Sequence, residues 1–198
     1  DGIPDKWTVA FRPDLDPRAP VAPLASRAVT TPTNQIAGLA TPARLVVAPG
    51  HLYVTERDAH RIGVFNRATG LRIANVGSQG AIDGQFNYPN GIAADPRPGR
   101  HRFAVADQQN NRVQVFAYDP VSGAVTFEFK FGTASASPSP EAPNGTFAGP
   151  RAVTIAADGS LIVADTGNQR LQRFDAAGTF LSRLQLAADN STVPEGLC

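Results

Sequence analysis

The stretch that decides the fold is "VADTGNQRLQRF" (residues 163–174), because the chain contains two more versions of it. These are "VADQQNNRVQVF" (105–116) and "VTERDAHRIGVF" (54–65). In every version an acidic residue stands five positions before an arginine, and a phenylalanine follows the arginine four positions later. Successive versions begin 51 and 58 residues apart. Repetition at such a period indicates stacked supersecondary units.

Each unit predicts four short antiparallel strands. In the third unit the strands are expected at 152–156, 161–164, 170–174 and 180–184. Asp158-Gly159 and Ala177-Gly178 are hairpin signals, and the polar stretch 166–169 supplies the middle turn. Four antiparallel strands per repeat of about 45 residues make the blade of a β-propeller. The sequence therefore predicts an all-β fold built from such blades.

The residues that flank the repeated stretch carry a family resemblance. The pattern P-x-G-I-A-x-D, preceded by G-x-F and followed by V-A-D-x-x-N-x-R-V-Q-V-F, is similar to the NHL repeat over residues 41–196. The first copy departs from it, since residues 43–47 lack the glycine and Glu56 replaces aspartate. The resemblance implies a β-propeller with three complete four-stranded NHL-type blades, at 41–77, 88–132 and 149–184, and a fourth that begins at 194. It does not imply one activity, because members bind protein, RNA or glycans, and related propellers include lyases and phytases.

Residues 1–40 do not match the repeat and are expected to form a separate leader. "KWTVAF" (6–11) predicts one strand, and the prolines from Pro13 to Pro32 predict an extended crossing segment. "DGIPDKW" resembles the second half of a bacterial calcium loop found beside extracellular domains. Asp1 and Asp5 alone cannot supply the roughly six to eight oxygens that calcium takes. No cofactor is therefore assigned, and calcium stays open.

The repeated polar residues are expected to serve the blades themselves. Each carboxylate can accept backbone N–H groups in its turn, and the arginine can reach that carboxylate or the carbonyls of a neighbouring blade. The phenylalanines are expected in the core between blades. The residues concerned are Glu56, Arg61, Phe65, Asp107, Arg112, Phe116, Asp165, Arg170 and Phe174.

Function is expected where the copies differ. The resemblance implies that the turns between second and third strands, together with the interblade linkers 78–85 and 133–146, form the usual ligand side of the propeller. The candidate ligand-binding residues are Arg57, Asp58, His60, Gln108, Gln109, Asn110, Thr166, Asn168 and Gln169. Amide, hydroxyl and charged groups suit a polar ligand or a protein partner. The favoured function is thus a non-catalytic recognition or scaffold module, with solvated turns that bind nothing as the plain alternative.

The charge balance argues against nucleic acid as a partner. Lys and Arg number 18 against 17 Asp and Glu, which gives a net charge of +1. The one dense basic cluster is "RPGRHR" (97–102), where Arg97, Arg100 and Arg102 could hold an anion. No aromatic residue interleaves with it as a base-stacking platform would require.

Few residues suggest catalysis, so no catalytic residue and no metal ligand is assigned. The three histidines, His51, His60 and His101, fall in different turns without zinc-ligand spacing. The sequence contains no G-x-S-x-G elbow and a single cysteine. The alternative function is a propeller enzyme of hydrolase or lyase type. Its calcium-dependent, phytase-like version would need clustered carboxylates, whereas the 17 acids are scattered.

The last residues, "VPEGLC" (193–198), repeat the opening "YPNGIA" (88–93) of the second unit. An open array of blades exposes the apolar faces of its end units. The expectation is therefore a larger propeller, completed by further chain or by a partner. No apolar run is long enough to span a bilayer, and a secreted or periplasmic location is expected.

Overall fold

The computed structural model describes residues 38–185, which contain three four-stranded antiparallel sheets. Each sheet is one blade, and its four strands follow one another in chain order. The first blade consists of β1 (Pro42–Ala48), β2 (His51–Glu56), β3 (Arg61–Asn66) and β4 (Arg72–Val76). The second consists of β5 (Pro89–Ala94), β6 (Arg102–Asp107), β7 (Arg112–Tyr118) and β8 (Val125–Phe131). The third consists of β11 (Ala152–Ile155), β12 (Leu161–Asp165), β13 (Arg170–Phe174) and β14 (Phe180–Gln185).

The turns form where the sequence predicts them. Gly159 and Gly178 both adopt a φ of +86°, which glycine reaches without steric cost. The middle turns of the second and third blades are single 3₁₀ turns, Gln108–Asn110 and Thr166–Asn168. A short parallel pair, β9 (Thr133–Ala134) and β10 (Thr146–Phe147), ties the long second linker together. The predicted strands of the third blade differ from the observed ones by at most one residue at either end.

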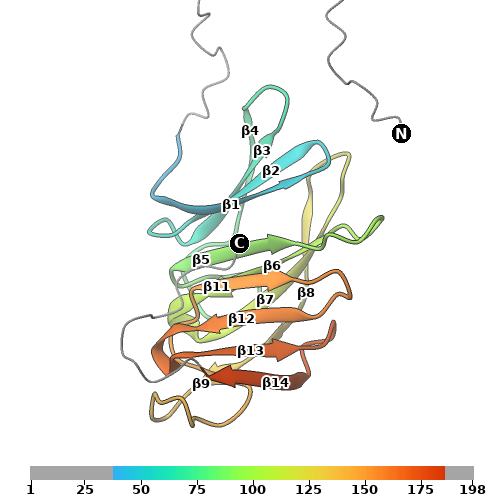
Figure 1. Cartoon of the computed structure of the whole chain (residues 1–198). Helices are drawn as coiled ribbons and strands as arrows, with labels where there is room; N and C mark the ends of the chain where they lie inside the picture. Colours follow the sequence, from blue (N-terminus) through green and yellow to red (C-terminus); the bar gives the residue numbers. More distant parts are fainter. Residues whose placement is uncertain (1–37, 186–198) are drawn as a thin grey trace, which may run out of the picture. The chain divides into compact units, whose positions relative to one another are not determined.

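The first strands of the three blades, β1, β5 and β11, lie next to one another (Figure 1). The hydroxyl of Thr55 in the first blade donates a 2.7 Å hydrogen bond to the carbonyl of Asn90 in β5. On the other side of β5, a Cβ on Gly91 would stand only 2.6 Å from the Cα of Ala152. Glycine at position 91 therefore permits the close approach of the second and third blades.

The hydrophobic core lies in two layers, one between the first and second blades and one between the second and third. In the first layer Ile62 and Val64 pack with Phe103 and Phe116. In the second layer Val113 and Val115 of β7 are the corresponding residues, and they pack with Val163 and Phe174 among others. Full burial of one such side chain is worth roughly 1.5–3 kcal/mol. The apolar faces of the blades thus hold neighbouring blades together.

A phenylalanine from each linker completes each layer. Phe86 and Phe147 both stand three residues before the proline that opens a blade, and both are fully buried. A Cβ on Gly77 would meet the ring of Phe86 at 2.5 Å, and one on Gly132 would meet the ring of Phe147 at 2.3 Å. The glycine after the fourth strand therefore makes room for the aromatic ring of the linker. We call Phe86 and Phe147 the linker plugs.

The all-β propeller prediction is confirmed, and so is the placement of Phe116 and Phe174 between blades. Phe65 is also fully buried, but the guanidinium of Arg72 in its own blade lies over its ring, 4.5 Å from the centroid. The predicted leader and the predicted start of a fourth blade fall outside the described residues, apart from residues 38–40 of the leader. Within residues 38–185 there is no helix of the length and apolarity needed to cross a membrane.

Candidate functional site

The carboxylate of Asp165 is a fully buried polar group of the third blade. Its Oδ2 accepts hydrogen bonds from Arg170 Nε at 2.9 Å, Asn168 Nδ2 at 2.8 Å and Gln172 Nε2 at 3.0 Å. Its Oδ1 accepts the backbone N–H of Ala148 at 2.8 Å. Asp165 and Arg170 are both fully buried, and a charge without such partners would be very costly there.

Arg170 joins this carboxylate to the linker that enters the blade. Its guanidinium donates to the carbonyls of Ala142, Pro143 and Thr146, the last two at 2.9 Å. The second blade repeats the arrangement, since Arg112 donates to Asp107 and to the carbonyls of Ala81, Ile82 and Gln85. We call each such group a carboxylate clasp. The prediction that the repeated acid and arginine serve the scaffold is confirmed, with the linker as the element held.

The carboxylates were expected to accept N–H groups from their own turns, and this detail is wrong. The backbone N–H donors to Asp107 and Asp165 are Asn87 and Ala148, which lie in the linkers between blades, residues 77–88 and 132–151. The physical reason is that the linker must otherwise bury unpaired backbone groups. Burial raises the pKa of Asp107, against the lowering effect of the hydrogen bonds from Asn87, Asn110 and Arg112.

The clasp of the first blade has a different composition. Glu56 accepts from Arg61 at 2.6 Å and also from Arg72, which reaches it from β4. Gly63 stands where the other blades carry Gln114 and Gln172, and a Cβ there would lie 2.8 Å from Arg72 Nη1. Glycine 63 thus opens the space that Arg72 fills. Burial acts to raise the pKa of Glu56, but the hydrogen bonds from Arg72 and Arg61 outweigh it and lower the pKa.

The variable turns predicted to bind a ligand occupy equivalent places in the three blades. Each turn is bonded to the linker of its own blade, through Arg57 N–H to Thr41, Gln109 N–H to Asn87 and Gly167 N–H to Ala148. The structure therefore brings the turns and the linkers to the same end of the blades. We call this end the turn face.

Several of the predicted site residues are used within the scaffold. The side-chain amide of Asn110 donates to Asp107 and to the carbonyl of Gly80, both within 2.9 Å. Asn168 is fully buried on Asp165, and Thr166 is buried beside it in the same turn. His60 accepts the backbone N–H of Tyr88 at 3.1 Å, just before the second blade begins.

The remaining predicted residues are exposed or contact the first strand of their blade. Arg57 and Asp58 form an exposed ion pair at 2.7 Å. Gln109 and Gln169 are exposed. Gln108 turns toward the first strand of its blade, where its Oε1 accepts from Asn90 Nδ2 at 3.2 Å. Ligand binding by these residues stays a prediction.

Two residues at the turn face were missed by sequence reasoning. Asn90 and Arg151 directly follow the prolines that open the second and third blades, and both are half-buried. The carbonyl of Arg151, directly before β11, lies 2.8 Å from a Cβ built on Gly91 of β5, so Asn90 and Arg151 lie at the same end of neighbouring blades. The sequence contained a signal for them: the position after the opening proline differs in every blade, with Ala43 in the first.

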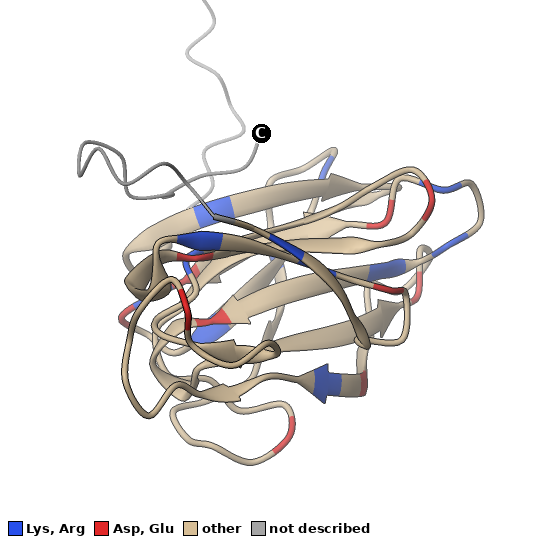
Figure 2. Cartoon of the chain, turned by 60° about the horizontal axis from the view of Figure 1, so that its bottom comes forward, with Lys and Arg blue, Asp and Glu red and all other residues tan. Residues whose placement is uncertain are grey.

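The basic cluster of residues 97–102 lies at the opposite end, in the turn between β5 and β6. Arg97 pairs with Asp95 at 2.5 Å, and Arg102 pairs with Glu128 at 2.5 Å. Figure 2 shows acidic and basic residues side by side near the ends of the strands. These pairings neutralise most of the positive charge that the sequence suggested for anion binding.

The carboxylates of residues 38–185 are all engaged. Those outside the clasps pair with a cation, as Asp83 does with Lys130, or accept N–H groups in a turn, as Asp119 and Asp175 do. In this part of the chain no three His, Cys, Asp or Glu side chains gather as a metal ion would require. In the described residues, the turn face offers amide and guanidinium groups, together with the imidazole of His60.

Comparison with solved structures supports the propeller fold. A putative 6-phosphogluconolactonase from Bacteroides fragilis is 17% identical, with a TM-score of 0.57 over 80% of this chain and 41% of that one. Virginiamycin B lyase from Staphylococcus aureus is 17% identical, with a TM-score of 0.52 over 78% of this chain and 44% of that one. The periplasmic gluconolactonase of Pseudomonas aeruginosa is 20% identical, with a TM-score of 0.52 over 73% of this chain and 39% of that one. The chain thus spans less than half the length of these propellers.

The sequence itself identifies a family. Residues 41–195 match the family described as "SMP-30/Gluconolactonase/LRE-like region", whereas no curated protein matches the chain. The matched residues contain all three blades, both linkers and all three carboxylate clasps. By this match the chain belongs to the SMP-30/gluconolactonase/LRE-like family of β-propellers.

Proposed function

We propose that this chain is a recognition module that binds a small, polar, anionic ligand, such as a sugar acid, at the turn face. The observation that carries the proposal is the placement of an amide and a guanidinium group at the same end of neighbouring blades. The variable position after the opening proline carries Asn90 in the second blade and Arg151 in the third.

The chemistry of these side chains suits an oxygen-rich anion. A guanidinium group binds carboxylate or phosphate through paired hydrogen bonds, and an amide group can satisfy a hydroxyl as donor or acceptor. Arg57, Gln109 and Gln169 lie on the same face and add exposed donors. A protein partner that presents acidic groups is recognised by the same chemistry.

A second candidate is hydrolysis of a sugar lactone, which membership of the family favours. Ring opening needs a base or a metal to activate water. Because the described carboxylates already have partners, a carboxylate in this role would have to come from residues outside 38–185 or from additional blades. Calcium, if used, would be held there too.

Two finer assignments also stand as proposals. The blades are of the NHL type, which the repeated V-A-D and Pro-x-Gly patterns support. The protein acts outside the cytoplasm, which is compatible with the periplasmic location named for the Pseudomonas aeruginosa propeller.

The test uses 6-phosphogluconate as the probe. Backbone amide NMR shifts should move at Asn90, Gln109 and Arg151 when the probe is added, and Arg151→Ala should weaken binding at least about tenfold, as expected for one charge-assisted contact. Arg100→Ala removes the same charge at the opposite end and serves as the control. Equal weakening by both variants, or shifts confined to the basic cluster, would refute the proposed site.

The rival activity is measured on the same samples. Release of acid from glucono-δ-lactone, followed by pH-stat with and without calcium, should not exceed the buffer rate. Turnover above that rate would replace the recognition proposal by the hydrolase.

A further inference from the structure

The same hydrogen bond joins one blade to the next at both junctions. The last residue of a blade's middle turn accepts the backbone N–H of the residue before the next blade's opening proline. At the first junction His60 Nδ1 accepts from Tyr88 at 3.1 Å, and at the second Asn111 Oδ1 accepts from Gly149 at 2.8 Å. All four residues have a φ between +51° and +59°. Each junction therefore requires one acceptor and two residues with left-handed backbone.

The first junction meets this requirement at a steric cost that the second avoids. Glycine adopts left-handed backbone freely, and asparagine is among the residues that tolerate it best. A bulky residue such as Tyr88 with a positive φ is an outlier. Strain of this kind gathers at functional sites. Because Gly149 makes the same hydrogen bond without strain, the ring of Tyr88 points to a purpose outside the scaffold.

The rings of Tyr88 and His60 form an aromatic pair at the turn face. Their centroids are 4.7 Å apart, and their planes meet edge to face at 78°. Tyr88 is 39% exposed, although an aromatic ring stabilises a fold mainly through its burial. Because His60 Nδ1 accepts a hydrogen bond, the neutral imidazole carries its proton on Nε2. The pair thus presents a ring surface and an N–H donor.

A charged donor and a charged acceptor lie in the same turn as His60. Arg57 Nε donates to Asp58 Oδ1 at 2.7 Å, and these side chains are 48% and 41% exposed. The pKa of Arg57 is raised first by its hydrogen bond to Asp58 and to a smaller degree by the Tyr88 hydroxyl, so this hydroxyl lies near the guanidinium. The ion pair has no net charge. The surface therefore combines an aromatic ring with polar groups that suit an uncharged ligand.

We propose that these four residues bind an uncharged pyranose ring, at a site separate from the anion site at Asn90 and Arg151. One face of a pyranose consists of C–H groups, which match the electron-rich face of the tyrosine ring. Each hydroxyl of the sugar both donates and accepts, so a guanidinium beside a carboxylate can bind two neighbouring hydroxyls. A nucleobase also stacks on tyrosine, but Asp58 places a negative charge where a phosphate backbone needs cations.

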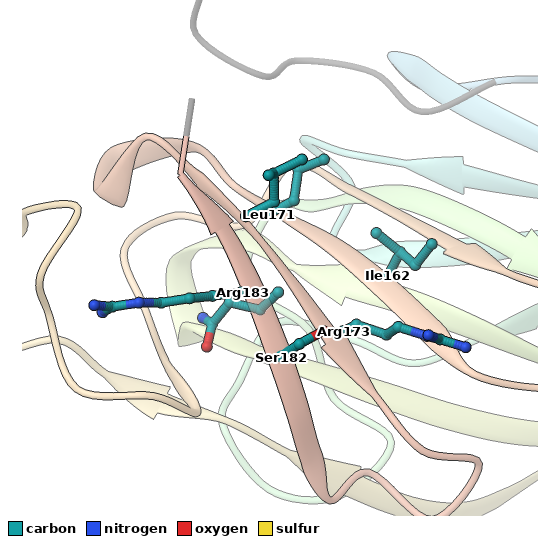
Figure 3. A pocket seen from close by; sticks show the side chains of 7 residues that line it. Ile162, Leu171, Arg173, Ser182 and Arg183 are labelled. Carbon is teal, nitrogen blue, oxygen red and sulfur yellow. The ribbon is translucent and has the colours of Figure 1, made fainter. Parts of the chain in front are cut away.

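The site consists only of the first blade's middle turn and the linker into the second blade. A larger apolar hollow on the third blade differs in kind. Ile162 and Leu171 project from the sheet there, while Arg173 and Arg183 extend to its two sides (Figure 3). In strand register Leu171 corresponds to Val113, which packs in the core layer between the second and third blades. That hollow thus has the character of an interface between blades rather than of a ligand site.

The first experiment titrates methyl β-D-glucopyranoside into the 198-residue chain and follows backbone amide NMR shifts. Shifts are expected at residues 57–60 and 88. Sorbitol, which has the hydroxyls without the ring, should cause none. Tyr88→Phe keeps the aromatic ring and should keep the affinity, whereas Tyr88→Asn should weaken binding at least about tenfold. Asparagine tolerates the left-handed backbone, so this variant should remain folded.

The double variant His60→Asn with Tyr88→Gly gives the first junction the residues of the second. It keeps the hydrogen bond between the blades and removes the strain at residue 88. Its melting temperature, followed by circular dichroism, should therefore equal or exceed that of the unmodified protein, while glucoside binding is lost. A clearly lower melting temperature would assign the rings to the scaffold and overturn the inference, as would glucoside binding that survives in the double variant.

The pyranose site and the anion site can be tested separately. The double variant should still bind 6-phosphogluconate, and Arg151→Ala should still bind the glucoside. Absence of shifts at residues 57–60 and 88 with the glucoside would overturn the pyranose site, whatever 6-phosphogluconate does. Tighter binding of single-stranded oligouridylate than of the glucoside, lost in Tyr88→Asn, would assign the rings to nucleic acid instead.

Discussion

Replacing Arg170 by alanine should destabilise the third blade far more than the equivalent change in the first. Arg170 is fully buried and joins Asp165 to three linker carbonyls. Its removal leaves a buried carboxylate without its counter-ion, which costs about 3–5 kcal/mol. The linker carbonyls that lose Arg170 can accept hydrogen bonds from water instead, so they add less to the loss of stability than an unpaired buried carbonyl would. We expect a loss of about 4 kcal/mol in the free energy of unfolding.

Arg61→Ala is the matched control, because it changes the same repeat position. The side chain of Arg61 is 29% exposed, and Glu56 keeps Arg72 as a second cation when Arg61 is lost. A loss of about 1 kcal/mol or less is expected, as for exposed ion pairs. The two variants should differ in stability because the first blade has Gly63 in place of the glutamine, and Arg72 fills that space as a second cation for Glu56.

Urea unfolding followed by circular dichroism measures both variants at one protein concentration. With a slope of about 2 kcal/mol per M, the midpoint should fall by about 2 M for Arg170→Ala and by about 0.5 M or less for Arg61→Ala. The double variant Asp165→Ala with Arg170→Ala should lose less than the sum of the two single losses, because both changes remove one interaction. Equal midpoints for Arg61→Ala and Arg170→Ala would refute the reasoning.

Three further predictions concern packing and pH. Gly91→Ala should cost about 1–3 kcal/mol in thermal unfolding, because its Cβ would stand 2.6 Å from Ala152; an unchanged melting temperature would contradict the close approach of the blades. The lowered pKa of Glu56 means that its contribution to stability is present above its ordinary value near 4.5 and is lost as the pH falls through the lowered value. When the pH is lowered from 5 through the lowered pKa of Glu56, the free energy of unfolding should therefore fall less in Glu56→Gln than in the wild type. An equal fall in both proteins would count against the clasp. Burial raises the pKa of Tyr53 well above its ordinary value near 10, so its contribution to stability falls as the pH rises above about 10. Tyr53→Phe should flatten that alkaline loss and cost nothing at neutral pH, since the buried hydroxyl has no partner among the described residues; a variant as alkali-sensitive as the wild type would argue against it.

The fold was predictable because the same pattern of strands and turns occurs three times in the sequence. The acid, arginine and phenylalanine of each copy place the middle hairpin, and glycines such as Gly159 and Gly178 mark the outer turns. Strand boundaries in the third blade followed from the same signals to within a residue. The role of Arg170 in the scaffold was predictable from its recurrence alone.

Other features depend on contacts between residues far apart in the chain. Arg72 fills the space of a missing glutamine, and only the structure shows that Gly63 makes this space. The linker amide that binds Asp107 lies 20 residues before it in the chain. Asn90 and Arg151 occupy a position that varies within the repeat, but their placement at the same end of neighbouring blades is known only once the blades are stacked. The side-chain partners of Asn110 and Asn168 were equally hidden, so both were taken for surface groups.

The central claim is that the carboxylate clasps hold the linkers as firmly as the strands, and amide hydrogen exchange tests it most directly. Peptides that contain Asn87 and Ala148 should exchange as slowly as peptides from β6 and β12, because these linker amides donate to buried carboxylates. In Asp165→Ala the linker around Ala148 should exchange quickly while the linker around Asn87 stays protected. Fast exchange of both linkers in the unmodified protein would contradict the account.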